Sequence, residues 1–315
     1  MKFFKCLNLN LNDNVGLMCC YGVTQESKTQ NYALILPFME NGSLRSYLNQ
    51  NFNSLTWIQK LDIMFSISAG LFFIHSKNLM HKDLHLGNVL QENKFNTRIS
   101  DFGFCKPADE ISSNSNSKNV YGVMPYMAPE ILRGKKYTQK SDMYSFGIIM
   151  NEIISIVPPF NNEPHDEHLA LDICRGKRPK IREETPEFLK ELIQKCWDAN
   201  PENRPSSDEV YYELDNYIFG KNCKELEKLE ELSYEFTETT DTKLFETHPQ
   251  AIYTSRLLNF SNLPEPVNCP NQEEFVSSRN GKFITLFILY YKLLIINFID
   301  TPRSKCLNCA IINIK

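Results

Sequence analysis

Three side chains near the middle of the chain have the types and spacing needed to transfer a phosphoryl group. Asp83 lies in the run HKDLHLGNVL, Asn88 follows five residues later, and Asp101 opens the tripeptide Asp-Phe-Gly. In this chemistry one carboxylate accepts the proton of the attacking hydroxyl, while an amide oxygen and a second carboxylate hold Mg²⁺ against the phosphates. Asp83 therefore suits the proton acceptor, and Asn88 and Asp101 suit the metal ligands.

The elements that must position these residues can be predicted from hydrophobic periodicity. Apolar side chains recur at helical spacing over residues 54–76, so we expect a long, mostly buried helix that begins at Ser54 or Thr56. This helix would lead into the loop at residues 80–90. Residues 98–100 are expected to form a strand that leads into the Asp-Phe-Gly tripeptide.

Shorter elements are expected on both sides of this centre. Residues 21–24 and 32–36 are typical of two strands of a hairpin, and Ser43 is typical of the N-cap of a short helix through Leu48. Four more helices are expected at 138–157, 166–174, 186–197 and from Ser206 or Ser207 to about Tyr217.

Five short motifs occur in one order: HKDLHLGN, DFG, APE, DMYSFG and ENRP. In this order they make the chain resemble the eukaryotic protein kinases over roughly residues 18–217. The resemblance implies an α+β, protein-kinase-like fold that consists mostly of the α-helical large lobe with a remnant of the β small lobe. It divides the chain into a partial small lobe (1–36), the hinge and large lobe (37–217) and a poorly structured C-terminal tail (218–315).

The resemblance also implies roles for single residues at the nucleotide. Asp83 would be the proton acceptor, and Asn88 and Asp101 would hold Mg²⁺ on ATP. Leu36 would be the gatekeeper at the end of the small lobe. Met39 would offer its backbone N–H and C=O to adenine, and Leu90 would contact the nucleotide from the large lobe.

Four further residues would have structural roles. His81 is implied to be a scaffold residue and not a base, and Asp142 is implied to hold the backbone of the 80–90 loop. Glu130 and Arg204 are implied to form a largely buried, bidentate ion pair, from which neither partner could be removed without leaving an uncompensated buried charge.

The activity implied by the resemblance is transfer of the ATP γ-phosphate to protein hydroxyls in intracellular signalling, with Mg²⁺ as the metal. The form Asp-Leu-His-x-Gly-Asn is similar to that of the tyrosine-kinase-like branch, whose members mostly phosphorylate Ser or Thr, so Tyr is the less favoured acceptor. His85 and Val123 stand where serine/threonine kinases usually carry Lys and Thr. Lys82 replaces the usual Arg, which predicts weaker coupling to a phosphorylated activation loop. Candidate phosphorylation sites in that loop are Ser112, Ser113, Ser115, Ser117 and Tyr121.

The sequence lacks several parts that protein kinases use to position ATP. It contains no glycine-rich loop, no strand lysine in a V-A-x-K setting and no matching helix glutamate. We therefore expect a chain truncated at its N-terminus. The alternative is a pseudokinase, an interaction module without turnover. A third hypothesis is a small-molecule kinase. It is disfavoured because the APE motif, with Arg204 of ENRP as the partner of its glutamate, builds a platform for peptide substrates.

Partners and location follow from composition and from the missing strands. Residues 32–36 would be left as an exposed edge, and we expect either that a partner covers it or that the native protein has more N-terminal sequence. The net charge of −4 argues against a nucleic-acid partner. The ten scattered cysteines are expected to be reduced thiols in a cytoplasmic, intracellular protein.

The tail after residue 218 is rich in polar and charged residues and is expected to be disordered or loosely packed. Its apolar stretch at 283–299 is shorter than the usual membrane span and is interrupted by Lys292 and Asn297. We favour a hydrophobic tail over a membrane anchor for this stretch, and the anchor stays open as an alternative.

Overall fold

The computed structural model describes residues 16–51, 54–93, 96–107, 119–220 and 246–279. The chain forms two compact units, residues 1–273 and 274–315. Only residues 274–279 of the second unit are described, and every element named below belongs to the first.

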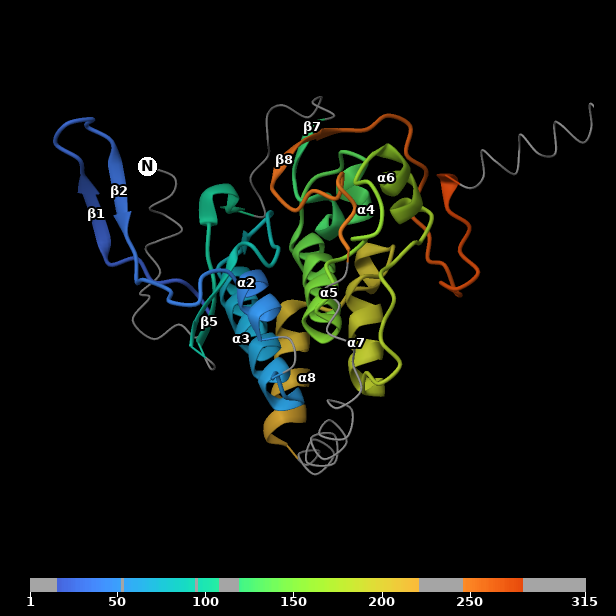
Figure 1. Ribbon diagram of the computed structural model, residues 1–315, viewed down its shortest axis with the longest axis horizontal. Coiled ribbons are helices and arrows are strands. Elements are labelled where there is room, and N and C mark those ends of the chain that lie inside the picture. Colours follow the sequence, from blue (N-terminus) through green and yellow to red (C-terminus); the bar gives the residue numbers. More distant parts are fainter. Residues whose placement is uncertain (1–15, 52–53, 94–95, 108–118, 221–245, 280–315) are drawn as a thin grey trace, which may run out of the picture. The chain divides into compact units, whose positions relative to one another are not determined.

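The α-helices of the chain lie between residues 44 and 219 of the described part (Figure 1). The α-helices are α2 (Leu44–Gln50), α3 (Trp57–Ser76), α4 (Pro129–Leu132), α5 (Gln139–Ser155), α6 (Glu167–Cys174), α7 (Glu187–Cys196) and α8 (Ser207–Phe219). The 3-10 turns are η2 (Phe102–Phe104), η3 (Met124–Tyr126) and η4 (Pro201–Asn203). The strands are β1 (Gly22–Gln25), β2 (Tyr32–Ile35), β3 (Leu79–Met80), β4 (Val89–Asn93), β5 (Asn96–Ile99), β6 (Lys106–Pro107), β7 (Asn119–Gly122) and β8 (Arg256–Asn259). This mixed helix and strand content confirms the predicted α+β, kinase-like fold class.

The central helix α3 begins where a capping box forms. The Thr56 side chain accepts from the backbone N–H of Gln59, and the Gln59 side chain accepts from the backbone N–H of Thr56, so two otherwise unpaired amide groups are satisfied. Helix α3 packs against α8 and α5, and Phe65 and Phe72 both stack on Tyr211 of α8 at 5.2 Å. Its length and composition would also suit a membrane span, but more than half of it is buried, as in the core helix of a lobe.

The strands around the loop at residues 80–90 form small antiparallel pairs. Strand β4 pairs with β5, with Val89 opposite Ile99. Residues 16–18 extend this pair, because the N–H of Ile99 donates to the Gly16 carbonyl at 2.8 Å and the Ile99 carbonyl accepts from Met18 at 2.8 Å. Strand β4 was not predicted as a separate element, since its apolar run continues directly from the loop.

The β1–β2 hairpin is a separate pair in which all four side chains of β2 are exposed. Tyr32 is 77% exposed, and Ile35 and Leu36 are about half exposed. The side chains of residues 32–36 are therefore exposed, and the predicted partner at this edge stays a prediction.

The predicted tail needs one correction, because residues 246–273 are packed onto the large lobe. Strand β8 pairs with β7 (Figure 1), Leu258 is 6% exposed, and the N–H of Val267 donates to the Cys174 carbonyl at 3.0 Å. A polar sequence with few apolar anchors gives no periodic signal of this pairing, since the partner strand lies far away in the chain. The stretches 221–245 and 280–315, with the apolar run 283–299, lie outside the described residues.

Candidate active site

The loop at residues 80–90 is held in place by the buried carboxylate of Asp142, near the start of α5. One carboxylate oxygen accepts from the backbone N–H of His81 at 2.8 Å, and the other accepts from that of Lys82 at 2.9 Å. The Nε2 atom of His75 lies 3.0 Å from the first oxygen. Burial by itself raises the pKa of Asp142, but these partners, His75 foremost, outweigh it and lower that pKa.

Two residues that flank the site have left-handed backbone conformations. Lys82 has φ +74° and Asp101 has φ +57°, a region that costs a residue with a side chain on the order of 1–2 kcal/mol. The bond from Asp142 to the N–H of Lys82 helps to offset this cost. The left-handed turn at Lys82 sets the direction of the backbone as it enters the next residue, Asp83.

Asp83 is 6% exposed and has a fixed set of neighbours. Asn88 donates its side-chain N–H to the Asp83 backbone carbonyl at 2.8 Å, and the Nε2 atom of His85 lies 3.8 Å from the Asp83 carboxylate. Burial alone would raise the pKa of Asp83, but the nearby His85 ring and the hydrogen bond from the Ser255 hydroxyl outweigh it and hold that pKa below its usual range. The carboxylate is thus ionised at neutral pH, as a proton acceptor must be.

The β4–β5 hairpin brings Asn88 and Asp101 to one end of the site. Asn88 directly precedes β4, and Ser100 directly follows β5. Both the N–H and the hydroxyl of Ser100 donate to the Asn88 carbonyl, each at 2.8 Å. His81 lies beneath this junction, with Nε2 2.9 Å from the Ser100 carbonyl, and burial lowers its pKa.

The side chains of Asn88 and Asp101 carry the amide and carboxylate oxygens that Mg²⁺ prefers as ligands. The Asn88 amide nitrogen is used as a donor to Asp83, so its Oδ1 is the atom suited to a metal. The Asp101 carboxylate lies at the exposed side of the loop. No group of three His, Cys, Asp or Glu that could hold a metal occurs among the described residues. Mg²⁺ commonly takes one or two ligands from protein carboxylates and the rest from phosphate and water.

The predicted hinge residues occupy different surroundings. Leu36, after β2, is 45% exposed, whereas Met39 is 7% exposed. A turn after Met39 is closed by a hydrogen bond of 3.0 Å from the N–H of Gly42 to the Met39 carbonyl. The Gly42 carbonyl in turn accepts from the N–H of Gln91 at 2.9 Å, which places this turn beside Leu90. The structure therefore brings Met39 and Leu90 into one region.

The ion pair between Glu130 and Arg204 connects α4 to the residue that follows η4. The two guanidinium nitrogens donate to the two carboxylate oxygens at 2.7 and 2.8 Å, and the Arg204 side chain is fully buried. The Arg204 Nε–H donates to the Asp198 carbonyl at 2.8 Å, and the guanidinium lies over the Tyr144 ring. Each of these contacts uses the planar fork of the Arg side chain.

Ser255 is a residue of the site that sequence reasoning missed. Its hydroxyl donates to the Asp83 carboxylate at 2.6 Å and lies 3.3 Å from Nε2 of His85. Ser255 directly precedes β8 and is separated from Asp83 by 172 positions. No motif marks it, because the contact depends on how the tail crosses the lobe.

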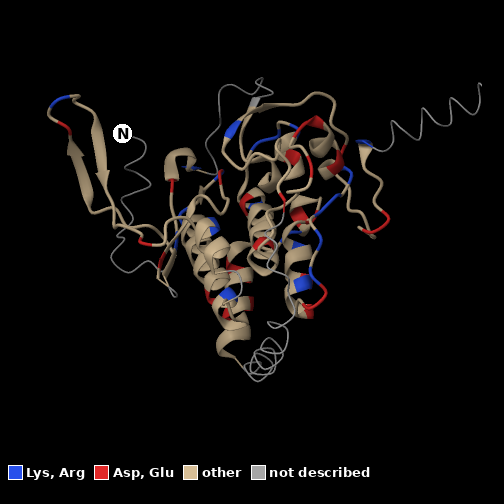
Figure 2. Ribbon diagram, in the orientation of Figure 1, with Lys and Arg blue, Asp and Glu red and all other residues tan. Residues whose placement is uncertain are grey.

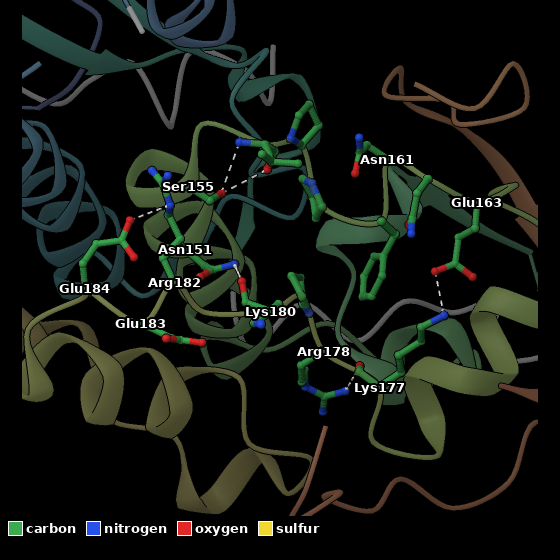
Figure 3. Close-up of a pocket in the computed structure, with 16 residues that line it drawn as sticks. Asn151, Ser155, Asn161, Glu163, Lys177, Arg178, Lys180, Arg182, Glu183 and Glu184 are labelled. Atoms are coloured by element: carbon green, nitrogen blue, oxygen red, sulfur yellow. Dashed lines mark hydrogen bonds and ion pairs between the residues drawn. The ribbon is translucent and has the colours of Figure 1, made fainter. Parts of the chain in front are cut away.

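A separate cavity of about 710 Å³ lies elsewhere in the large lobe (Figure 3). Its lining residues come from two segments, 151–163 and 177–184, and Lys177 pairs there with Glu163 at 2.6 Å. None of the candidate catalytic residues reaches it. In the view of Figure 2, basic and acidic side chains are interspersed over the helices of the lobe, a pattern unlike that of a nucleic-acid-binding face.

In comparisons with known proteins, the chain is similar to protein kinases. The sequence model of protein tyrosine and serine/threonine kinases matches residues 6–214. A putative serine/threonine-protein kinase/receptor of Acanthamoeba polyphaga mimivirus is 33% identical over 189 residues, 59% of this chain and 11% of that protein. A protein kinase and PP2C-like domain-containing protein of Arabidopsis thaliana is 31% identical over 246 residues, 68% of this chain and 37% of that protein. An RGS domain-containing serine/threonine-protein kinase A of Dictyostelium discoideum is 29% identical over 230 residues, 68% of this chain and 20% of that protein. The chain thus spans well under half the length of these relatives.

Proposed function

We propose that this chain, which belongs to the family of protein tyrosine and serine/threonine kinases, transfers the γ-phosphate of ATP to Ser or Thr hydroxyls of proteins. The observation that carries the proposal is the convergence of Asp83, Asn88 and Asp101 at one end of the β4–β5 hairpin. Asp142 fixes the first of these through the loop backbone, and Ser100 joins the other two.

Each of these side chains has a distinct task in the proposed reaction. The ionised Asp83 carboxylate orients the acceptor hydroxyl and takes its proton as the oxygen attacks phosphorus. The oxygens of Asn88 and Asp101 would hold Mg²⁺, which would offset the charge of the ATP phosphates. ATP supplies the phosphoryl group. Because this chemistry depends mostly on positioning, the rigid backbone contacts of Asp142 matter as much as the reacting groups.

The choice of Ser or Thr rests on similarity. Two of the three relatives named above carry serine/threonine-protein kinase in their names, and the form Asp-Leu-His-x-Gly-Asn supports placement in the tyrosine-kinase-like branch. Tyr remains the second acceptor, because His85 and Val123 depart from the usual serine/threonine pattern. The six described cysteines that are free thiols support an intracellular setting.

A second candidate is an interaction module without turnover. It is favoured by one observation: the family's glycine-rich loop, strand lysine and helix glutamate have no counterpart in the sequence. Without the charge of that lysine, the α- and β-phosphates would be poorly positioned, and mispositioned phosphoryl transfer is slowed by orders of magnitude. The exposed apolar side chains of β2 would then serve a protein partner.

The two candidates are separated by nucleotide binding and transfer. The 315-residue chain is incubated with Mg²⁺ and labelled ATP in the presence of a degenerate library of Ser, Thr and Tyr peptides, while calorimetry measures ATP binding. A kinase binds ATP, labels Ser or Thr peptides and loses on the order of 10²–10⁴-fold in kcat in Asp83→Asn. If the chain neither binds ATP nor transfers phosphate, the kinase proposal is overturned and the interaction module remains.

A further inference from the structure

The segment of residues 246–273, here called the tail segment, crosses the large lobe at the catalytic loop. We propose that it occupies the site of a protein substrate and presents Ser255 as a phosphoacceptor in the same chain. This inference rests on the proposed kinase function and adds to it an intramolecular substrate and a substrate pattern.

The first argument is the position of the hydroxyl. The Ser255 oxygen lies 2.6 Å from the Asp83 carboxylate and donates its proton to it. This is the geometry that a general base needs toward the group it deprotonates. The same hydroxyl lies 3.3 Å from His85. Thr254, the adjacent residue, is exposed, so the chain directs one of two neighbouring hydroxyls into the site.

The second argument is that the backbone after Ser255 is held as an added strand. Strand β8 pairs antiparallel with β7, with Val120 opposite Leu258 and Gly122 opposite Arg256. An extended peptide that adds to an exposed strand gains affinity from backbone hydrogen bonds and specificity from alternate side chains. Figure 1 shows this strand beside β7. The tail segment thus binds as a peptide substrate could.

The third argument is that side chains on both sides of Ser255 fill defined positions. Two residues before it, the Tyr253 ring lies 4.7 Å from the Arg45 guanidinium, and its hydroxyl donates to the Pro159 carbonyl at 3.0 Å. One residue after it, Arg256 donates to the His165 carbonyl at 2.5 Å. These contacts predict the pattern that the cleft prefers: an aromatic residue two before the acceptor and a basic residue one after.

A fourth position completes this pattern. Leu258, three residues after the acceptor, is 6% exposed, whereas its neighbour Leu257 is 64% exposed. The strand therefore inserts one of two adjacent leucines, as alternation along a strand requires. An apolar residue three positions after the acceptor joins the predicted pattern.

The ends of the tail segment are anchored as well. At its start, the N–H of His248 donates to the Asn161 carbonyl at 2.7 Å. Near its end, the Asn268 side chain accepts from the N–H of Ala199 at 2.8 Å. Tethering at both ends raises the effective concentration of Ser255 at Asp83 far above that of a free peptide.

The proposed step balances in atoms and charge. The Ser255 oxygen attacks the γ-phosphorus of ATP, the new O–P bond forms, and the bond from that phosphorus to the bridging oxygen breaks to release ADP. The hydroxyl proton passes to Asp83. The product carries about −1.5 to −2 charges at neutral pH beside a buried carboxylate. This repulsion would expel the tail segment and open the site to other proteins.

The test uses the full 315-residue chain with Mg²⁺·ATP and an added peptide of the predicted pattern. We expect phosphate on Ser255 by peptide mapping, at a rate constant that does not change when the chain is diluted. Ser255→Thr keeps the acceptor, and Ser255→Ala removes it. The matched control Thr254→Ala leaves the labelling of Ser255 unchanged, and Asp83→Asn abolishes it.

Two outcomes count against the proposal and differ in what else they remove. Transfer to the added peptide without phosphate on Ser255 would overturn the tail proposal alone and leave the kinase function standing. An observed first-order rate constant for Ser255 labelling that rises in proportion to chain concentration would refute the intramolecular step. Transfer to neither acceptor would overturn the kinase function itself and, with it, the phosphoacceptor role of Ser255.

Discussion

Arg204 and Glu130 face each other through two hydrogen bonds of 2.7 and 2.8 Å, with the Arg side chain fully buried. This pair connects α4, which follows the β7–η3 region, to the start of α8. Because β7 also carries the tail segment, the pair supports the surface on which Ser255 is held. Its removal would leave one buried charge without a partner.

We predict that Arg204→Met lowers the free energy of unfolding by about 3–5 kcal/mol, because the Glu130 carboxylate stays behind unpaired. Arg204→Lys should recover only part of this, since an ammonium cannot form both hydrogen bonds. The matched control is Arg182→Met, which breaks a half-exposed pair with Glu184 and should cost under about 1 kcal/mol. Urea unfolding measures all three variants. Equal losses in Arg204→Met and Arg182→Met would refute the prediction.

The buried Asp142 should give stability a defined pH dependence. Its pKa in the folded chain is lowered, so its contribution is present above the unfolded value of about 3.9 and is lost as pH falls through the lower folded value. Asp142→Asn should cost about 1–3 kcal/mol at pH 7, because a backbone N–H of His81 or Lys82 loses its acceptor. The difference from wild type should shrink below about pH 4. A difference that stays constant down to the acid transition would contradict this account.

The close approach of Gly16 to α3 can be tested by adding one methyl group. A Cβ at Gly16 would meet the Ser66 carbonyl at 2.0 Å, and its φ is +84°. Gly42 also has a positive φ, +64°, but no atom within 4 Å of its added Cβ. Gly42→Ala should therefore cost about 1–2 kcal/mol from backbone strain alone, and Gly16→Ala should cost clearly more. Thermal unfolding compares them, and equal shifts would mean that the close packing at Gly16 adds nothing.

The metal role of Asp101 predicts a loss that depends on magnesium. Asp101→Asn should weaken binding of Mg²⁺·ATP at least about tenfold, roughly 1.4 kcal/mol, because a carboxylate ligand becomes a neutral amide. Binding of ATP in the presence of a chelator should change little. Calorimetry with and without Mg²⁺ distinguishes a contact of Asp101 with the metal from a contact with the nucleotide. An equal loss in both conditions would show that Asp101 contacts the nucleotide and not the metal.

The pairing of β8 with β7 can be followed by hydrogen exchange. Leu258→Asp places a charge where a buried leucine contributes about 1.5–3 kcal/mol, so the amide groups of β7 should exchange on the order of 10–100-fold faster. Leu257→Asp, on the exposed side of the same strand, is the matched control and should leave exchange unchanged. The same acceleration in both variants would mean that the side-chain packing of Leu258 does not hold the tail segment.

Much of the large lobe could be predicted because its signals are local. The helix at 54–76 has an apolar period and a Thr56 cap, and the structure begins α3 directly after that residue. Ser43 likewise caps α2. The order of five motifs indicated the family, which the match over residues 6–214 confirms. These features depend on neighbours within a few positions, where side-chain type determines the outcome.

The sequence by itself determined which residues have the chemistry: a carboxylate, an amide and a second carboxylate at fixed spacing around Asp83. Only the tertiary structure decided what surrounds them. The sequence predicted a loosely packed tail, whereas the structure places Ser255 on Asp83 and pairs β8 with β7. The physical reason is that backbone hydrogen bonds between strands are nearly independent of side-chain type. The sequence of a four-residue strand therefore gives little indication of the distant strand with which it pairs.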